Sequence, residues 1–92
     1  MRVRWLSRSA EDLERLDEYI AKDNPKAAAT EAGKVMEAVK RLGKYPDSGR
    51  PGRVSDTREL VVSSYIVAYR VKGEVVQVLR VLHAARKWPE SL

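Results

Sequence analysis

Histidine is the side chain that titrates near neutral pH, and this chain has one, His83. With Arg80 and Arg86 close to it in the sequence, His83 could act as a general acid or base. The simpler interpretation, which this signal alone favours, is an ordinary residue that ends a strand. Arg80 stands within an apolar run, where an unpaired charge is costly, so its guanidinium must reach solvent or meet a carboxylate such as Glu59. A structural ion pair and a functional role both fit Arg80.

Two basic segments could contact a partner. Near the C-terminus, Arg86-Lys87-Trp88-Pro89 sets two cations beside an indole, which suits stacking on bases or pairing with phosphates. The indole could equally fold back as a lid on the core. Upstream, Gly49-Arg50-Pro51-Gly52-Arg53 lacks the spacing and the Lys-Ser/Thr end of a nucleotide-binding loop. We expect its glycines and prolines to fix a tight path that presents Arg50 and Arg53 outward.

The residue inventory excludes several kinds of site. The chain has no cysteine and one histidine, so disulfides, thiolate zinc sites and His-based metal clusters are excluded, and we expect neither a metal nor a cofactor. No serine stands in the G-x-S-x-G setting of hydrolases. The carboxylates between Glu11 and Glu18 lie around Arg15, which is typical of a solvated helix face rather than of an acid-base pair.

Length and composition indicate one folded domain over residues 1–92, because 43% of the residues are hydrophobic and 34% are charged. The net charge of +5 is uneven: residues 1–48 hold ten Lys/Arg against nine Asp/Glu, and residues 49–92 hold eight against four. Such a field favours nucleic acid or an acidic protein over a membrane surface. We see no secretory signal and no run of about 20 apolar residues that could span a bilayer. We therefore expect a soluble, cytoplasmic protein.

The elements that must position these residues follow from the apolar spacing. Residues 2–6 alternate as a short strand does, and residues 10–22 have helical spacing after a capping-box-like Ser9 and Asp12. Asn24-Pro25 then begins a second helix over residues 25–42, and Gly43 is expected to end it in the left-handed conformation. The short connection predicts that the two helices form an antiparallel hairpin.

After a glycine- and proline-rich loop, three strands are predicted over residues 58–62, 65–72 and 74–83, joined by turns at Ser63-Ser64 and Lys72-Gly73. These turns place Tyr69 opposite Val76 and Val67 opposite Val78 on the face that meets the helices. Three apolar residues fall on the opposite face, which we expect a partner or the chain's own tail to cover. These are Ile66, Leu79 and Val81. The fold class is therefore α+β, in the order strand-helix-helix-strand-strand-strand, with an antiparallel sheet against an N-terminal helical hairpin.

An ordered series of short motifs along nearly the whole chain resembles the RelE/ParE toxin superfamily. The specific part is the glycine-proline loop followed by Arg58-Glu59-Leu60 and a strand that ends in Leu82-His83 with Ala85-Arg86. The full series is Trp5, Ala10 to Leu13, Tyr19-Ile20, Asn24-Pro25, Ala27-Ala28, Pro46, Gly49 to Arg53, Thr57 to Leu60, Tyr65 to Arg70, Val78 to His83, Ala85-Arg86 and Trp88-Pro89.

This resemblance implies the toxin of a bacterial type II toxin-antitoxin system, neutralised by a ParD-like antitoxin with a ribbon-helix-helix start and a C-terminal segment that wraps the toxin. We expect the two proteins to form a hetero-oligomer. Such a segment needs apolar contacts. The residues expected to supply them are Leu13, Leu16, Ile20, Ile66, Leu79 and Val81.

The resemblance also implies one of two targets. ParE-like members poison DNA gyrase without cutting nucleic acid, whereas RelE-like members cleave mRNA in the ribosome with a Lys/Arg cluster on the sheet. The nuclease branch usually has an arginine at the position of Ile66, and Ala84 and Ala85 stand where it carries basic residues, so we favour gyrase inhibition. An inactive family member that only binds its antitoxin is a third reading.

Each target implies its own residues. For gyrase, the expected contact residues are Arg80, His83, Arg86, Lys87 and Trp88, and no residue is catalytic. For RNA cleavage, the catalytic residues would be Arg70, Arg80, His83 and Arg86.

Overall fold

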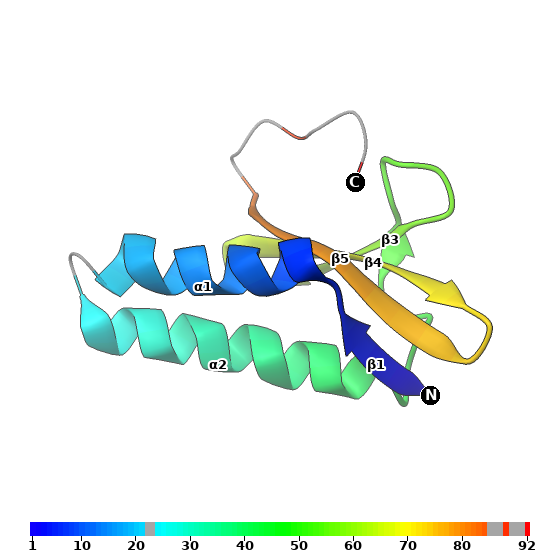
Figure 1. Ribbon diagram of the computed structural model, residues 1–92, viewed down its shortest axis with the longest axis horizontal. Helices are drawn as coiled ribbons and strands as arrows, with labels where there is room; N and C mark the ends of the chain where they lie inside the picture. Colours follow the sequence, from blue (N-terminus) through cyan, green and yellow to red (C-terminus); the bar gives the residue numbers. More distant parts are fainter. Residues whose placement is uncertain (22–23, 85–87, 89–91) are drawn as a thin grey trace.

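The computed structural model describes residues 1–21, 24–84, 88 and 92, without the side chains of 17–21, and folds as two helices against one five-stranded sheet (Figure 1). The elements in chain order are β1 (Arg2–Trp5), α1 (Ser7–Ala21), α2 (Pro25–Leu42), β2 (Arg50–Pro51), β3 (Arg58–Val62), β4 (Tyr65–Lys72) and β5 (Val75–His83). This confirms the predicted α+β class and the order of the elements. Among the described residues, no helix is long and apolar enough to cross a membrane.

The sheet has the strand order β1-β5-β4-β3-β2, and its two outer strands differ from the prediction. β1 pairs parallel with β5, so the prediction of an antiparallel sheet is wrong at this edge. Along the chain, the helical hairpin stands between β1 and the other strands. Such a long connection permits a parallel pair, which a tight turn does not. At the other edge, the two-residue β2 pairs antiparallel with β3.

Helix α1 begins at Ser7 rather than near residue 10, and Ser9 is not its N-cap. The first intrahelical bond runs from the Ala10 N–H to the Leu6 carbonyl, so Ser9 lies inside the first turn. The buried Ser9 hydroxyl contacts the Leu6 carbonyl at 2.8 Å and the Val78 carbonyl of β5 at 2.7 Å. The residue that reads as a cap therefore ties the helix to the sheet.

Helix α2 begins and ends where the sequence predicts. The Asn24 side chain accepts a hydrogen bond from the Ala27 N–H at 3.2 Å, and Pro25 occupies the first turn. The prediction that Gly43 ends the helix in the left-handed conformation is wrong, because its backbone is right-handed at φ −61° and ψ −29°. The reason for glycine here is close packing: a Cβ would lie 2.7 Å from the Met1 carbonyl oxygen.

The hairpin between β4 and β5 turns one residue later than predicted. Lys72 pairs with Val75, so the turn residues are Gly73 and Glu74, and Tyr69 pairs with Val78 instead of Val76. A register error of two residues leaves each of these side chains on its predicted face, because the side-chain period of a strand is two.

A bulge between Ala68 and Tyr69 then changes the register, so that Val67 pairs with Val81 instead of Val78. The inserted residue on β5 reverses the alternation beyond it. Val81 is therefore 4% exposed and faces the helices, not the opposite side of the sheet as expected.

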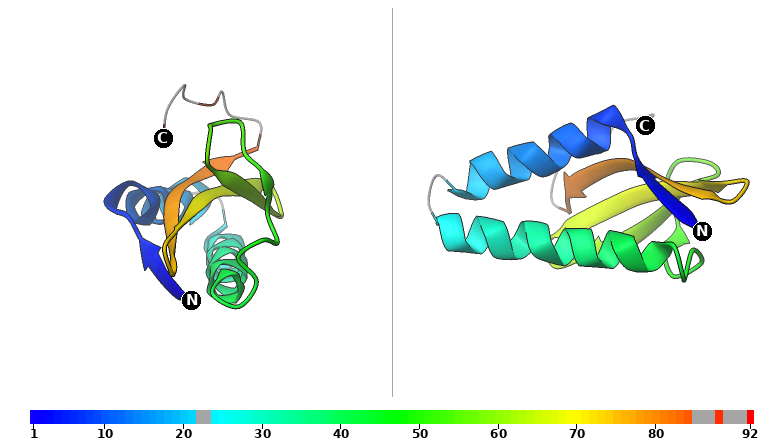
Figure 2. Two further views of the ribbon diagram at one scale, coloured as in Figure 1. Left: turned by 90° about the vertical axis from the view of Figure 1, so that its right-hand side faces the viewer. Right: turned by 60° about the horizontal axis from the view of Figure 1, so that its bottom comes forward.

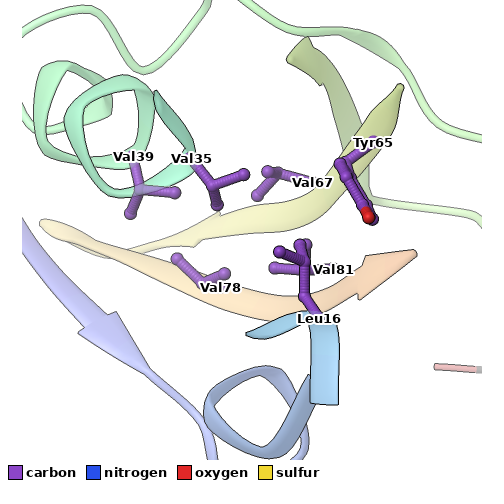
Figure 3. Close-up of a cluster of buried hydrophobic side chains, with 7 residues drawn as sticks. All are labelled: Leu16, Val35, Val39, Tyr65, Val67, Val78 and Val81. Atoms are coloured by element: carbon purple, nitrogen blue, oxygen red, sulfur yellow. The ribbon is translucent and has the colours of Figure 1, made fainter. Parts of the chain in front are cut away.

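The core lies between the helical hairpin and the sheet (Figure 3). Its main cluster comprises Leu16 from α1, Val35 and Val39 from α2, and Tyr65, Val67, Val78 and Val81 from the sheet. On the opposite face, Ile66, Ala68 and Leu82 are also buried, at 3%, 0% and 1% exposure. The views in Figure 2 show the two helices together on one side of the sheet.

Candidate functional site

Arg80 is held by a carboxylate of helix α1. β1 pairs with β5 only as far as Val78, and beyond that point α1 packs along the β5 edge. Arg80 donates through Nε to Asp12 Oδ2 at 2.7 Å and through its NH2 group to Oδ1 at 3.0 Å. The Val81 N–H also donates to Asp12, at 3.0 Å, so one carboxylate satisfies both the strand edge and the guanidinium.

The Asp12–Arg80 pair is largely shielded from solvent, because the side chains are 6% and 13% exposed. The hydrogen bond to Asp12 is the main cause that raises the pKa of Arg80 above its usual value. The expectation that Arg80 meets a carboxylate holds, but Glu59 is not its partner. Ala68 of β4 lies between Glu59 of β3 and Arg80 of β5, so the two are two strands apart.

The residues expected for RNA cleavage lie apart. His83 is exposed at the end of β5, where its ring meets Tyr65 edge to face at 5.4 Å. Arg70 is exposed and donates from Nε to the Gln77 side chain at 2.7 Å. Since His83 pairs with Tyr65, Arg70 lies five residues further along β4, or about 16 Å. Arg86 lies outside the described residues.

A buried glutamate organises the glycine-proline loop. Glu59, 2% exposed, accepts from the Arg53 N–H at 2.8 Å and from the Arg50 guanidinium at 3.3 Å, and the Arg53 Nε lies 3.7 Å away. The Arg50 and Arg53 side chains are nevertheless 55% and 49% exposed, so the loop presents them outward as expected. We call Arg50, Arg53 and Glu59 the loop cluster. The sequence suggested Glu59 as a partner for Arg80 and did not predict that it organises this loop; its only indication of a buried role is an acid within an apolar strand.

Trp88 lies against the loop cluster. The Arg53 guanidinium carbon lies 4.3 Å from the centre of the Trp88 ring, which is cation–π geometry. The indole is half-buried, and its Nε1 is buried without a hydrogen-bond partner in the described part of the chain. Lys87, expected beside it, lies outside the described residues.

Tyr69 fixes the start of the same loop. Its hydroxyl, on a fully buried side chain, accepts from the Gly49 N–H at 2.9 Å and donates to the Pro46 carbonyl at 2.7 Å. A Cβ at Gly49 would lie 2.6 Å from this hydroxyl, so the approach requires glycine.

The apolar residues expected to meet an antitoxin are mostly in the core. Leu16, Leu79 and Val81 are 4–7% exposed and Ile66 is 3% exposed, so the fold itself already buries them. Leu13 is half-buried and packs against the main core cluster. The Ile20 side chain lies outside the described residues.

An open apolar groove lies elsewhere, between α2 and β3. It has a volume of about 700 Å³ and is lined by Lys34, Ala38, Arg41, Tyr45, Leu60 and Val61, among others. Val61 and Tyr45 are 55% and 56% exposed. β2 pairs only with Arg58 and Glu59, so past Glu59 no strand in the described part of the chain covers the outer edge of β3. We call this the α2–β3 groove.

Within residues 1–21, 24–84, 88 and 92, no three His, Cys, Asp or Glu side chains gather as metal ligands would. The arrangement provides charged and apolar surfaces for binding. Among the described residues, the candidate catalytic side chains Arg70, Arg80 and His83 do not meet at one point.

A protein-family model matches nearly the whole chain. Residues 3–88 match the model of the ParE toxin of the type II toxin-antitoxin system parDE. Y4kP of Sinorhizobium fredii, provisionally named a toxin, is 44% identical over 93 residues, which cover 99% of this chain and 96% of that protein. Toxin RelE2 of Caulobacter vibrioides is 33% identical over 84 residues, covering 91% of this chain and 96% of that protein.

Solved structures from toxin-antitoxin systems share the fold. The chromosomal ParDE system of P. aeruginosa contains a chain that is 30% identical, with a TM-score of 0.78 over 90% of this chain and 95% of that one. The toxin-antitoxin complex RelBE2 of Mycobacterium tuberculosis contains one that is 27% identical, with a TM-score of 0.63 over 89% and 95%.

Proposed function

The chain belongs to the ParE toxin family and is a toxin of a type II toxin-antitoxin system, and on this premise we propose that it arrests cells by binding DNA gyrase. The observation that carries the choice of target is the separation of the residues a nuclease would need. Arg70 and His83 lie about 16 Å apart along the sheet. Arg80 is bound to Asp12 and cannot turn toward a phosphate without leaving a buried carboxylate unpaired.

The proposed gyrase contact surface is the loop cluster together with Trp88 and His83. Arg50 and Arg53 are exposed cations in fixed positions because Glu59 holds both, and Trp88 supplies an aromatic surface beside them. Aromatic residues and arginines are the types that concentrate binding energy at protein interfaces. Arg86 and Lys87 belong to this proposal by sequence alone. Arg80 is left out, because Asp12 engages it at the edge of β5.

The test is a supercoiling assay with purified toxin and gyrase. We expect the toxin to stop supercoiling or to cause cleaved DNA to accumulate. The Arg50→Gln/Arg53→Gln variant should need at least a tenfold higher concentration for the same effect. The matched control is Arg15→Gln/Lys26→Gln, which removes the same charge from exposed helix positions.

Ribosome-dependent mRNA cleavage is the competing function, since RelE2 and the RelBE2 toxin are also similar to this chain. Primer extension on a translated message separates the two. Cleaved transcripts together with unchanged supercoiling would replace gyrase by the ribosome as the target.

We further propose that the antitoxin seats an apolar segment in the α2–β3 groove. The ParDE and RelBE2 structures both come from toxin-antitoxin systems, which supports a partner of this kind. The groove offers exposed Val61 and Tyr45 for apolar side chains and an open β3 edge for main-chain hydrogen bonds. Arg41 can meet an acidic side chain, whereas Lys34 is paired with Glu31 and Glu37 adds one acid to the lining.

Val61→Arg should weaken binding of the antitoxin encoded beside the toxin gene by about 100-fold, because a charge would be buried at the contact. Met36→Arg is the control: Met36 is 56% exposed on the same helix and does not line the groove. Equal affinity of the two variants, measured by calorimetry, would place the antitoxin elsewhere.

A further inference from the structure

Three neighbouring strands bring four cations together on the side of the sheet that faces away from the helices. Arg4 of β1 lies beside Gln77 of β5, which pairs with Arg70 of β4. One row further, Arg2 lies beside Val75, which pairs with Lys72. We call these two rows the basic sheet face.

The alternation of each strand fixes the direction of these side chains. In β1, Val3 and Trp5 pack against the core, so Arg2 and Arg4 point to the other side. In β5, Val76 and Val78 are fully buried toward the helices. A depression of about 470 Å³ is lined by Arg2, Val3, Arg4, Lys72, Val75 and Gln77. Arg70 does not line this depression, but its Nε is bound to Gln77, which does. The right panel of Figure 2 shows β1 running beside the β4–β5 hairpin.

The four cations are exposed, and no ion pair within the described part of the chain neutralises them. Arg2, Arg4 and Lys72 form no ion pair with any described residue, and Arg70 is bound only to the Gln77 amide oxygen, at 2.7 Å. That bond uses the Arg70 Nε and leaves its terminal N–H groups to donate elsewhere. Gln77 therefore orients one guanidinium over the centre of the face. Glu74 lies in the turn beyond the rows, next to Arg2, and Arg70 borders a second depression that Asp47 and Asp56 also line.

The spacing suits a chain of phosphates. Residues two apart on a strand lie about 6.6 Å apart, and β1 and β4 are separated by two strand spacings, about 10 Å. A nucleic-acid strand carries one phosphate per about 3.4 Å of helix axis, so each two-residue step along the sheet matches about two phosphates. Four flexible cations on this rectangle can each reach a separate phosphate.

The composition of the face favours nucleic acid over an acidic protein. Protein interfaces place aromatic or large apolar side chains at their centre, whereas Val75 is the one apolar side chain in these two rows. Protein–DNA interfaces are more polar and far more positive. Since neither row holds an aromatic residue to stack on bases, the contact is to the backbone of a duplex rather than to a single strand.

We propose that the basic sheet face of Arg2, Arg4, Arg70 and Lys72 binds the phosphodiester backbone of duplex DNA without reading its sequence. This binding goes beyond the proposed function and does not depend on which target the toxin inhibits. The toxin would then have a DNA-binding surface of its own, separate from the α2–β3 groove and from the loop cluster.

Fluorescence anisotropy of the full chain with a labelled duplex of arbitrary sequence, about 20 base pairs long, tests the proposal between about 50 and 200 mM KCl. With four phosphate contacts, a plot of the logarithm of the association constant against the logarithm of the salt concentration should have a slope of about −3.6. Arg4→Gln/Lys72→Gln should reduce this slope to about −1.8 and weaken binding about 60-fold at about 0.1 M salt. Arg15→Gln/Lys26→Gln is again the control of equal charge and should change binding less than about threefold.

Three results would overturn the proposal: an affinity that does not respond to salt, equal loss in both double variants, or displacement by polyglutamate as efficient as displacement by unlabelled duplex. The last would identify an acidic protein as the partner. Thermal unfolding of both variants confirms that the comparison is between folded proteins.

Discussion

Removing either side of the Asp12–Arg80 pair should destabilise the fold strongly. Asp12→Asn keeps an oxygen for the Val81 N–H but leaves the Arg80 guanidinium, whose side chain is 13% exposed, without its carboxylate. Arg80→Met leaves the Asp12 carboxylate, 6% exposed, without its cation. Breaking a buried pair costs about 3–5 kcal/mol, and we take the lower end because Arg80 is not fully enclosed.

The assay is urea unfolding followed by circular dichroism. A loss of about 3 kcal/mol, with a urea dependence of about 1.5 kcal/mol per molar, lowers the midpoint by about 2 M. In Asp12→Asn/Arg80→Met both charges are gone, and the introduced amide oxygen can still accept from the Val81 N–H, so the loss should stay near about 3 kcal/mol instead of doubling. The coupling energy is then about 3 kcal/mol.

The same variants distinguish a structural from a functional Arg80. If Arg80 acts only by securing α1 to β5, the double variant should still arrest growth when it is induced without antitoxin. A folded but harmless double variant would show that Arg80 touches the target. Single variants within about 0.5 kcal/mol of the parent, or strictly additive losses, would refute the reasoning about the pair itself.

Two further predictions concern close packing. Tyr69→Phe should cost about 1–3 kcal/mol, because the Gly49 N–H and the Pro46 carbonyl lose their shared partner, and an unchanged urea midpoint would exclude that anchor. Glycine-to-alanine changes in and after α2 should shift the free energy of unfolding in opposite directions. Gly33→Ala should stabilise the fold by about 0.5–1 kcal/mol, since nothing lies within 4 Å of the added methyl group. Gly43→Ala should destabilise it by about 1–3 kcal/mol, because the methyl group would meet the Met1 carbonyl oxygen. Thermal melting that moves the same way in both would contradict this.

Elements set by local sequence could be predicted, and contacts between distant elements could not. The bounds of α2 follow from Asn24 and Pro25 at one end and from the apolar stripe that stops at Leu42. Ser9 and Asp12 mimic a helix start because both residue types favour caps, yet the edge of β5 engages them. Nothing in the sequence near Ser9 reports that a strand 69 residues away leaves its edge groups open.

The same limit explains the candidate surfaces. The exposed loop arginines could be predicted because glycine and proline specify a turn locally. The bulge at Ala68/Tyr69 leaves no local signature, and it decides that Val81 belongs to the core instead of a partner surface. The basic sheet face depends on the parallel pairing of β1 with β5, which brings Arg2 and Arg4 from a nearly neutral half of the chain next to Arg70.

The central claim is that this toxin acts by binding gyrase and breaks no bond itself. The most direct measurement adds purified toxin to gyrase and relaxed plasmid, without ribosomes, and follows supercoiled and linear DNA against toxin concentration. The account predicts loss of supercoiling with accumulation of linear DNA, reversed by stoichiometric antitoxin. Full supercoiling at saturating toxin, from a preparation that still arrests growth in cells, would contradict it.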